Sequence, residues 1–287
     1  MKIRFIINPI SGTGNQKDID KLIARNFHNR NYEIYYTKKP KHATVLSAEA
    51  VKLGIDSVVA IGGDGTVNEC MKPIIDSNTA LGIIPCGSGN GFAIHLGINK
   101  DPAQAILQLK NVKKKIIDTG TVNDESFVNV SGIGFDAHIA NLFANSTKRG
   151  FINYIKLTLK ELRYKPKKYL IQYDGIERQV MAYAIVFANA SQYGNNARIS
   201  PKANINDGLL DFVIIRDFPN WKIPFFVSTV LRGKTHLSKK VEIIRTKKMK
   251  IESDDSLVHL DGEPKKMDNI ITVKVRPKSL KILTSNE

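Results

Sequence analysis

Residues 57–71 read SVVAIGGDGTVNECM, an apolar run that enters a cluster of glycines and leaves it through residues compatible with a helix. The apolar run predicts a buried strand over Ser57–Ile61, and the later residues predict a helix over Val67–Ile75. The loop between them, Gly62–Thr66, combines three glycines with one aspartate. Such a loop presents backbone N–H groups at a helix N-terminus, and glycine lets an anion approach the backbone closely. The pattern predicts a phosphate site.

Asp64 is the acid within this loop. A carboxylate in a loop that attracts anions is best explained by a divalent cation held between the carboxylate and the phosphates. A plain tight turn would need neither three glycines nor an acid. We therefore predict that Asp64 binds a divalent metal ion.

Two more glycine loops follow predicted strands. Residues 8–14 read NPISGTG after the strand Ile3–Ile7, and residues 85–91 read PCGSGNG after the strand Leu81–Ile84. Because the carboxyl ends of parallel strands share one edge of a sheet, we expect all three loops to form one crevice. None of them matches GxxxxGK[ST] or GxGxxG, which disfavours a P-loop NTPase and an ordinary dinucleotide-binding protein.

The chain divides into two predicted domains. Its first hundred residues alternate strands with helices, including helices near Asp18–Phe27 and Ala43–Leu53, and predict a parallel α/β domain. After a basic turn predicted at Lys113–Lys115, short strand-like segments predict a mainly antiparallel β domain. We place the first domain at residues 1–120, to which residues 276–287 return, and the second at residues 121–275.

The second domain contains six predicted strands and two apolar helical insertions. The insertions, at Gly150–Tyr164 and Trp221–Arg232, are flanked by Lys and Arg, so they either touch lipid or cover one face of the β domain. The strands are at residues 127–131, 169–173, 180–189, 209–215, 248–252 and 257–260.

Composition limits the cellular setting and the partners. The 287 residues include 43 Lys and Arg against 27 Asp and Glu, a net charge of +16, which favours nucleic acid, an anionic membrane surface or a polyanionic small molecule as partner. Cys70 and Cys86 have neither disulfide-framework nor zinc spacing. The apolar segment Val180–Ala190 is much shorter than the roughly 18 residues that span a bilayer. We expect a cytoplasmic protein.

A late motif carries two carboxylates. Residues 258–264 read VHLDGEP, which places Asp261 and Glu263 around a glycine at the end of a predicted strand. This is a suitable position for a general base facing a cleft, and it is also an ordinary hairpin turn.

The complete set of motifs resembles the diacylglycerol kinase catalytic-domain family, which includes bacterial lipid kinases and sphingosine kinases. NAD kinases and phosphofructokinases share the GGDGT loop, but its combination with the later motifs is specific. The resemblance implies a phosphofructokinase-like α/β domain, a β-sandwich domain, and ATP in the cleft between them. Diacylglycerol or a sphingoid-like alcohol would be phosphorylated. The motifs are NPxSG at residues 8–12, GGDGTxNE at 62–69, GSGN at 87–90 and DGE at 261–263.

The resemblance also implies roles for particular residues. Glu263 would be the general base beside Asp261, Asp118 a supporting acid, and Asp64 a ligand of the catalytic magnesium. A second, structural magnesium would be bound by the Asp207 carboxylate and the backbone carbonyls of Asn204 and Leu209. The three loops and their flanks would contact the nucleotide through Asn8, Pro9, Ser11, Gly12, Thr37, Gly62, Gly63, Asp64, Gly65, Thr66, Asn68, Glu69, Gly87, Ser88 and Asn90.

Two other functions stay open at this point. The GGDGT loop also permits a kinase of NAD or of another small molecule. The net charge and the RNP1-like start at Arg149–Ile152 permit a nucleic-acid-binding protein. Under the lipid kinase interpretation the protein binds anionic membranes peripherally and no nucleic acid is expected. A homodimer is left open.

Overall fold

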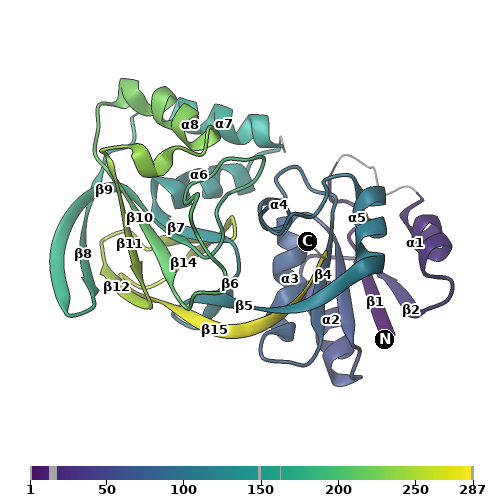
Figure 1. The fold of residues 1–287 in the computed structure, drawn as a ribbon. Coiled ribbons are helices and arrows are strands. Elements are labelled where there is room, and N and C mark those ends of the chain that lie inside the picture. Colours follow the sequence, from purple (N-terminus) through teal and green to yellow (C-terminus); the bar gives the residue numbers. More distant parts are fainter. Residues whose placement is uncertain (1, 13–17, 148–149, 162, 286–287) are drawn as a thin grey trace. The chain divides into compact units, whose positions relative to one another are not determined.

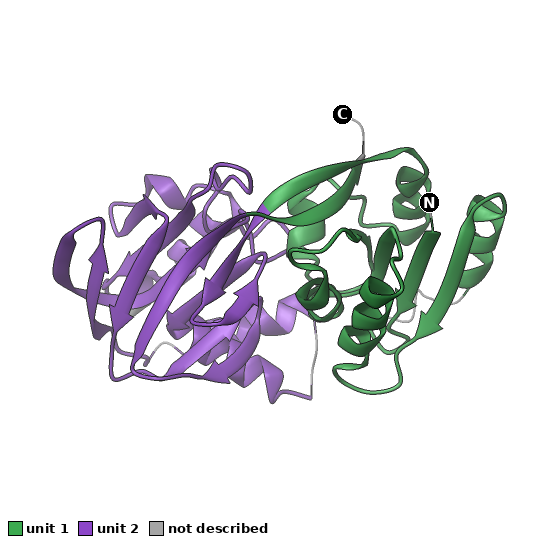
Figure 2. Ribbon diagram, turned by 90° about the horizontal axis from the view of Figure 1, so that it is seen from below, with its two compact units in different colours: residues 1–117, 278–287 green, residues 118–277 purple. Residues whose placement is uncertain are grey.

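A computed structural model of the chain describes residues 2–12, 18–147, 150–161 and 163–285. The chain forms two compact units (Figure 2). Unit 1 consists of residues 1–117 and 278–287, and unit 2 of residues 118–277. Two long strands, β5 (Val112–Val122) and β15 (Ile270–Ser285), contribute residues to both units.

Unit 1 contains a parallel sheet in the order β4-β3-β1-β2. The last part of β15 joins it beside β4, also in parallel, with Ile282 opposite Leu81. All residues of β3 and β4 are buried, which accounts for their continuous apolar sequences. The parallel α/β domain that the sequence predicts is thereby confirmed. The strands are β1 (Lys2–Ile7), β2 (Asn31–Tyr36), β3 (Ser57–Gly62) and β4 (Ala80–Pro85).

Helices cover both faces of this sheet. On one face, α1 (Ile19–Phe27) and α5 (Pro102–Gln108) share a core with Ile3, Phe5 and Ile7. Arg4 faces the other side, because side chains alternate along a strand, and its guanidinium donates to Leu46 O in α2 at 2.8 Å. Packed against α2 (His42–Lys52) is α3 (Asp64–Ile74). The short helices α4 (Gly91–His95) and η1 (Leu109–Asn111) complete the unit.

Unit 2 is built mainly from antiparallel strands. The strands follow one another in the order β14-β13-β7-β9-β8-β12-β15, and β9 also pairs with β10, which pairs with β11. This confirms the predicted antiparallel β domain. The strands are β6 (Glu125–Phe127), β7 (Val130–Gly134), β8 (Lys167–Tyr173), β9 (Ile176–Ala188), β10 (Leu210–Arg216), β11 (Val241–Thr246), β12 (Lys248–Glu252), β13 (Leu257–Leu260) and β14 (Glu263–Lys266).

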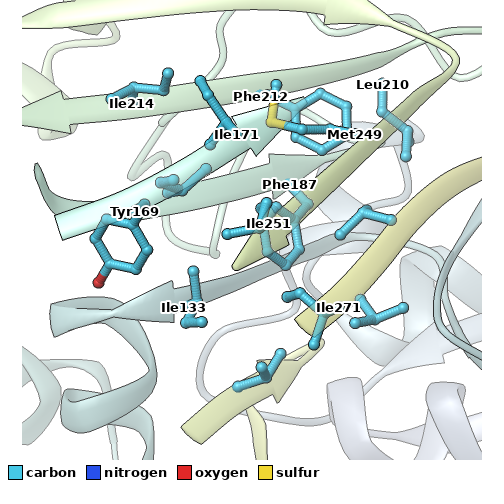
Figure 3. Packing of buried hydrophobic residues seen from close by; sticks show 14 of the residues in the cluster. Ile133, Tyr169, Ile171, Phe187, Leu210, Phe212, Ile214, Met249, Ile251 and Ile271 are labelled. Atoms are coloured by element: carbon cyan, nitrogen blue, oxygen red, sulfur yellow. The ribbon is translucent and has the colours of Figure 1, made fainter. Parts of the chain in front are cut away.

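Strand β9 is buried on both faces along its second half. Ile185 and Phe187 point into the core between the β layers, which Figure 3 shows around Phe187, whereas Ala184 and Val186 point to the opposite side. On that side, three helices cover the sheet (Figure 1). They are α6 (Phe135–Ala144), α7 (Phe151–Lys160) and α8 (Ile223–Leu231), with the short turns η2 (Asn220–Lys222) and η3 (Thr235–Leu237).

The structure corrects two details of the predicted elements. Lys113–Lys115 lies within β5 and is not a turn; residues 113–116 are all exposed, so the burial alternation that marks a strand is missing there. The strand predicted over Phe127–Ser131 is interrupted at Val128 and Asn129. Both backbone N–H groups donate to the Asp261 carboxylate, at 3.0 and 2.8 Å, instead of entering a β-ladder.

Within the described part of the chain, no helix is both long enough and apolar enough to cross a bilayer. Neither Cys70 nor Cys86 forms a disulfide bond.

Candidate active site

Three loops lie together at the carboxyl edge of the unit 1 sheet. The Asn8 side-chain amide donates to the Thr66 hydroxyl at 3.0 Å, which links the loop after β1 to the loop after β3. The backbone N–H of Cys86 donates to Gly62 O at 2.8 Å, which links the loop after β4 to the end of β3. Parallel strands predict this arrangement, because their carboxyl ends share one edge.

Glycine is required where these loops touch. A Cβ added at Gly12 would lie 1.7 Å from the carbonyl oxygen of Cys86, and Gly12 has a φ of +76°. A Cβ added at Gly87 would lie 2.6 Å from the Cα of Gly63. Because the obstructing atoms belong to the backbone, no side-chain rotation can relieve either clash. The three loops therefore form one packed backbone surface.

The loop after β4 is closed by its own asparagine. The Asn90 side chain accepts a hydrogen bond from the Gly87 N–H at 3.0 Å and donates to Gly87 O at 2.7 Å. Asn90 is buried with a φ of +52°, a conformation that asparagine tolerates better than most residues. Ser88, between them, is exposed. The loop thus places an exposed serine on a fixed backbone.

Asp64 is the first residue of α3, so the helix begins earlier than the predicted Val67. Gly63 is the extended cap, and residues 64–66 form the first turn, where backbone N–H groups have no partner within the helix. Asp64 is half-buried, Gly65 is exposed, and Thr66 is buried. Backbone donors and a hard-oxygen carboxylate therefore occupy one helix turn, a donor set that suits phosphate and magnesium.

Glu69 and Asn68, two predicted nucleotide contacts, lie near the start of α2 and in the interior of unit 1, respectively. The Glu69 carboxylate accepts hydrogen bonds from the backbone N–H groups of Lys41 and Ala43, at 3.0 and 3.1 Å, at the start of α2. Asn68 is buried. A nucleotide contact of Glu69, which the resemblance implies, would thus compete with these two hydrogen bonds to the start of α2.

The remaining predicted nucleotide contacts lie at the ends of β1 and β2. The Ser11 hydroxyl donates to Asn8 O at 3.1 Å, and Pro9 is exposed. Thr37 follows β2, is half-buried, and donates its backbone N–H to Ile7 O at 2.8 Å. Thr13 and Gly14, the end of the predicted first loop, lie outside the described residues, as does Arg149 of the RNP1-like segment.

The DGE motif in unit 2 is a two-residue hairpin turn between β13 and β14. Asp261 and Gly262 have φ values of +50° and +90°, which is the type I′ geometry that Asp-Gly favours. The Asp261 carboxylate is held by Val128 and Asn129, as described above. Glu263 is the first residue of β14 and is half-buried. Asp261 therefore anchors the turn, and Glu263 stands beside it.

Asp118 lies in unit 2 and holds a loop. It is buried, its Oδ2 accepts a hydrogen bond from the Gly208 N–H at 2.7 Å, and its own N–H donates to Ile205 O at 2.7 Å. These two contacts fix the segment 204–209, where the resemblance implies a structural magnesium.

Both carboxylate oxygens of Asp207 have partners within unit 2. Asp207 Oδ1 accepts the Leu209 N–H at 3.0 Å, and Oδ2 forms an ion pair with Arg245. Arg245 also pairs with Asp211 at 3.1 Å, and the Asn204 side chain accepts the Asn206 N–H at 3.1 Å. The guanidinium thus supplies the positive charge here. Across the described residues, no group of three or more His, Cys, Asp or Glu side chains is arranged for a metal ion.

Unit 2 also contains an apolar pocket under its helices. Its empty volume, including the part open to solvent, is about 850 Å³. The pocket lies between α6, α7 and α8 and the sheet, and almost all of its lining is apolar. The lining includes Phe135, Ile139, Phe151, Ile155, Ile199, Phe218, Phe226, Val227 and Val230.

One carboxylate, which the sequence reasoning missed, lines this pocket. Asp136 accepts hydrogen bonds from Tyr193 at 2.9 Å, Tyr154 at 3.5 Å and His259 at 2.7 Å. Burial and the nearby carboxylate raise the pKa of both tyrosines well above the usual range, so both hydroxyls stay protonated donors. The available signal was an acid two residues after Gly134, where β7 ends.

Comparison with known proteins agrees with this architecture, in which a glycine-loop α/β unit is joined to an antiparallel β unit. Residues 2–122 match the diacylglycerol kinase catalytic domain, and residues 129–284 match the YegS C-terminal NAD kinase beta sandwich-like domain. The crystal structure of a diacylglycerol kinase from Bacillus anthracis str. Sterne superimposes with a TM-score of 0.78, at 22% identity, over 99% of this chain and 97% of that one.

Relatives by sequence place the chain in a family. It is 33% identical to a "Probable lipid kinase YegS-like" of Chromohalobacter salexigens, over 76% of this chain and 73% of the relative. It is 30% identical to a "Diacylglycerol kinase" of Mycobacterium tuberculosis, over 91% and 88%. The chain therefore belongs to the diacylglycerol kinase catalytic-domain family of lipid kinases, as its motifs indicated.

The loop contact yields a graded prediction. Gly87→Ala should lower the free energy of unfolding by about 1–3 kcal/mol, because its Cβ would press on backbone atoms. Gly63→Ala is the matched variant: its Cβ would lie 3.3 Å from the Gly87 Cα, so we expect a cost below about 1 kcal/mol. Urea denaturation measures both. Equal costs would contradict the packing described here.

Proposed function

We propose that the protein is an ATP-dependent lipid kinase that transfers the γ-phosphate of ATP to the hydroxyl of a lipid alcohol. The observation that carries the lipid half of this proposal is the apolar pocket of unit 2. A soluble substrate such as NAD would gain nothing from a pocket of that lining. A hydrocarbon chain gains roughly 0.8 kcal/mol for each CH₂ group that it buries.

The residues of unit 1 would bind the phosphates. The first turn of α3 and the loops around Gly12 and Gly87 offer backbone donors on a surface without side chains in the way, and Asp64 would bind magnesium. When bound, magnesium neutralises the negative charge of the phosphates. Thr66 and Asn8 hold two of these loops in register.

The proposed base is Glu263 in unit 2. Its carboxylate would accept the proton of the lipid hydroxyl while the hydroxyl oxygen attacks the γ-phosphorus and the bond to the β-phosphate breaks. The Asp261 anchor and the type I′ turn keep Glu263 at a fixed place next to β13. In phosphoryl transfer, charge neutralisation usually outweighs proton removal, so Asp64 should matter at least as much as Glu263.

Two isosteric substitutions test the reaction. Asp64→Asn and Glu263→Gln should each lower the transfer of label from ATP to lipid by about 100-fold or more, because one removes the metal ligand and the other the base. The assay uses purified protein, labelled ATP, magnesium and vesicles that carry a panel of lipid alcohols. Labelled NAD without labelled lipid would sink the proposal, and a fully active Asp64→Asn variant would remove the metal from it.

Filling the pocket tests the lipid site separately. Val227→Trp on α8 should raise the KM for a long-chain lipid alcohol by about 10-fold and leave the KM for ATP unchanged, because the indole takes up space that the chain needs. Val45→Trp, at an exposed position of α2, is the matched control. An unchanged lipid KM in the Val227 variant would show that the chain binds elsewhere.

We further propose that the outer surface of α8 and η2 contacts an anionic membrane. Trp221 and Phe225 are 64% and 66% exposed and pack edge to face, and the Lys222 ammonium lies 5.1 Å from the Trp221 ring centroid. Aromatic rings beside lysines suit the interface of anionic lipids, where each basic residue contributes about 1 kcal/mol. Phe225 lies on α8, a helix of which other residues line the pocket.

The membrane surface has its own test. The double variant Trp221→Ala/Phe225→Ala should lower affinity for vesicles containing phosphatidylserine by about 10-fold or more, because it lacks the two aromatic rings whose transfer from water into the interface favours binding. Val45→Ala/Leu53→Ala, at exposed apolar positions of unit 1, is the control. Vesicle sedimentation measures both. Equal retention of the two double variants would place membrane contact on another surface.

A further inference from the structure

The DGE turn forms a hydrogen bond to the buried side chain of His259, which in turn contacts the buried carboxylate of Asp136. The backbone N–H of Gly262 donates to Nδ1 of His259 at 3.1 Å, and Nε2 of the same ring lies 2.7 Å from Asp136 Oδ2. A backbone N–H can only donate, so Nδ1 must accept, and the ring carries its proton on Nε2. That proton points at the Asp136 carboxylate, which therefore fixes the tautomer that Gly262 needs.

The surroundings leave this pair little freedom. His259 is 2% exposed and Asp136 is 7% exposed. A Cβ added at Gly132 would lie 2.8 Å from Asp136 Oδ2 and 3.3 Å from His259 Nε2, so the β7 backbone packs directly against both groups. Tyr154 and Tyr193 donate to the same carboxylate from the pocket side. The carboxylate is thus held by hydrogen bonds on several sides.

The two N–H groups within the turn are both captured. The Asp261 N–H donates to the Ser131 hydroxyl at 3.2 Å, and the Gly262 N–H donates to His259. Glu263 is the next residue, so the direction of its Cα–Cβ bond depends on these contacts. A shift of about 1 Å in a reacting group can cost on the order of 100-fold in rate.

We infer that Asp136 and His259 are positioning residues for Glu263: Asp136 sets the His259 tautomer, and His259 holds the peptide that places the general base. This inference rests on the proposed function, in which Glu263 is the base. Because Asp136 also lines the apolar pocket, the group that fixes the turn is in contact with the proposed lipid site.

Two substitutions at His259 separate its two contacts. The Asn side-chain oxygen can take the place of Nδ1 and keep the Gly262 bond. The Gln side-chain nitrogen can take the place of Nε2 and keep only the Asp136 bond. We expect His259→Gln to lower kcat by about 10- to 100-fold with both KM values nearly unchanged, and His259→Asn to lose about threefold. His236→Gln, at an exposed position of η3, is the control.

Asp136→Asn completes a double-mutant cycle. It should lower kcat when His259 is present, because the amide allows the wrong tautomer, and should add little loss in the His259→Asn background. A purely structural role for Asp136 would give additive losses. An effect of Asp136→Asn on the lipid KM alone would make it a substrate contact and overturn the inference.

Amide hydrogen exchange at Gly262 provides a readout that needs no activity. The Gly262 N–H should be protected in the wild-type protein and in His259→Asn, and should exchange faster in His259→Gln. Urea denaturation confirms that each variant is folded. Equal protection in both variants, or equal kcat, would refute the positioning role. If the wild-type protein labels no lipid, the proposed function fails, while the exchange data still decide whether His259 holds the turn.

Discussion

The close approach of three backbone loops at one sheet edge constrains the rest of unit 1. Parallel strands bring their carboxyl ends together, so the chain segments that leave β1, β3 and β4 must share a small space. The contacts of Gly12 with Cys86 and of Gly87 with Gly63 leave no room for a Cβ. The same packed edge carries the start of α3, which has no side-chain cap and begins with Asp64. Packing at this edge and the proposed binding of phosphate therefore call for the same residue type.

Unit 2 fixes its DGE turn by a different means, through side chains that form hydrogen bonds to the backbone. Asp261 takes the N–H groups of Val128 and Asn129. Asn189 donates to the carbonyl oxygens of Val128 and Asp118, at 2.8 and 3.0 Å. Buried backbone groups that leave a β-ladder need such partners, because an unpaired one costs about 1–3 kcal/mol. The interruption between β6 and β7 is thus the counterpart of the anchored hairpin.

Features controlled by a local sequence pattern were predictable, whereas features controlled by residues far away in the sequence were not. The strand–loop–helix unit around Gly62–Thr66 and the apolar β9 are local patterns, and both were predictable. The interruption at Val128 and Asn129 was not, because its cause is Asp261, more than a hundred positions away. β5 was not predicted at Lys113–Lys115, because a strand that is exposed on both sides shows no alternation of apolar and polar residues.

The candidate site divides along the same line. Its glycines and acids form motifs that can be read in sequence, whereas the grouping of Asp136 with His259 exists only after folding, across a separation of 123 positions. The partner of Asp207 was equally hidden. Arg245 lies on β11, and its guanidinium forms an ion pair with the Asp207 carboxylate, the predicted magnesium ligand. Short motifs thus indicate chemistry, but the tertiary structure decides which positive group pairs with a given carboxylate.

The region around Asp136 is costly for a purely structural domain. An apolar pocket left open forgoes packing contacts, and a buried carboxylate loses hydration that its partners only partly replace. Larger side chains at Ala184 or Ala197, both in the pocket lining, would fill the space, and an apolar pair would remove the charge. Unit 2 has both features next to the hairpin that carries Glu263. Their coincidence favours a binding role for this part of the fold, because stability alone would select neither the open space nor the charge.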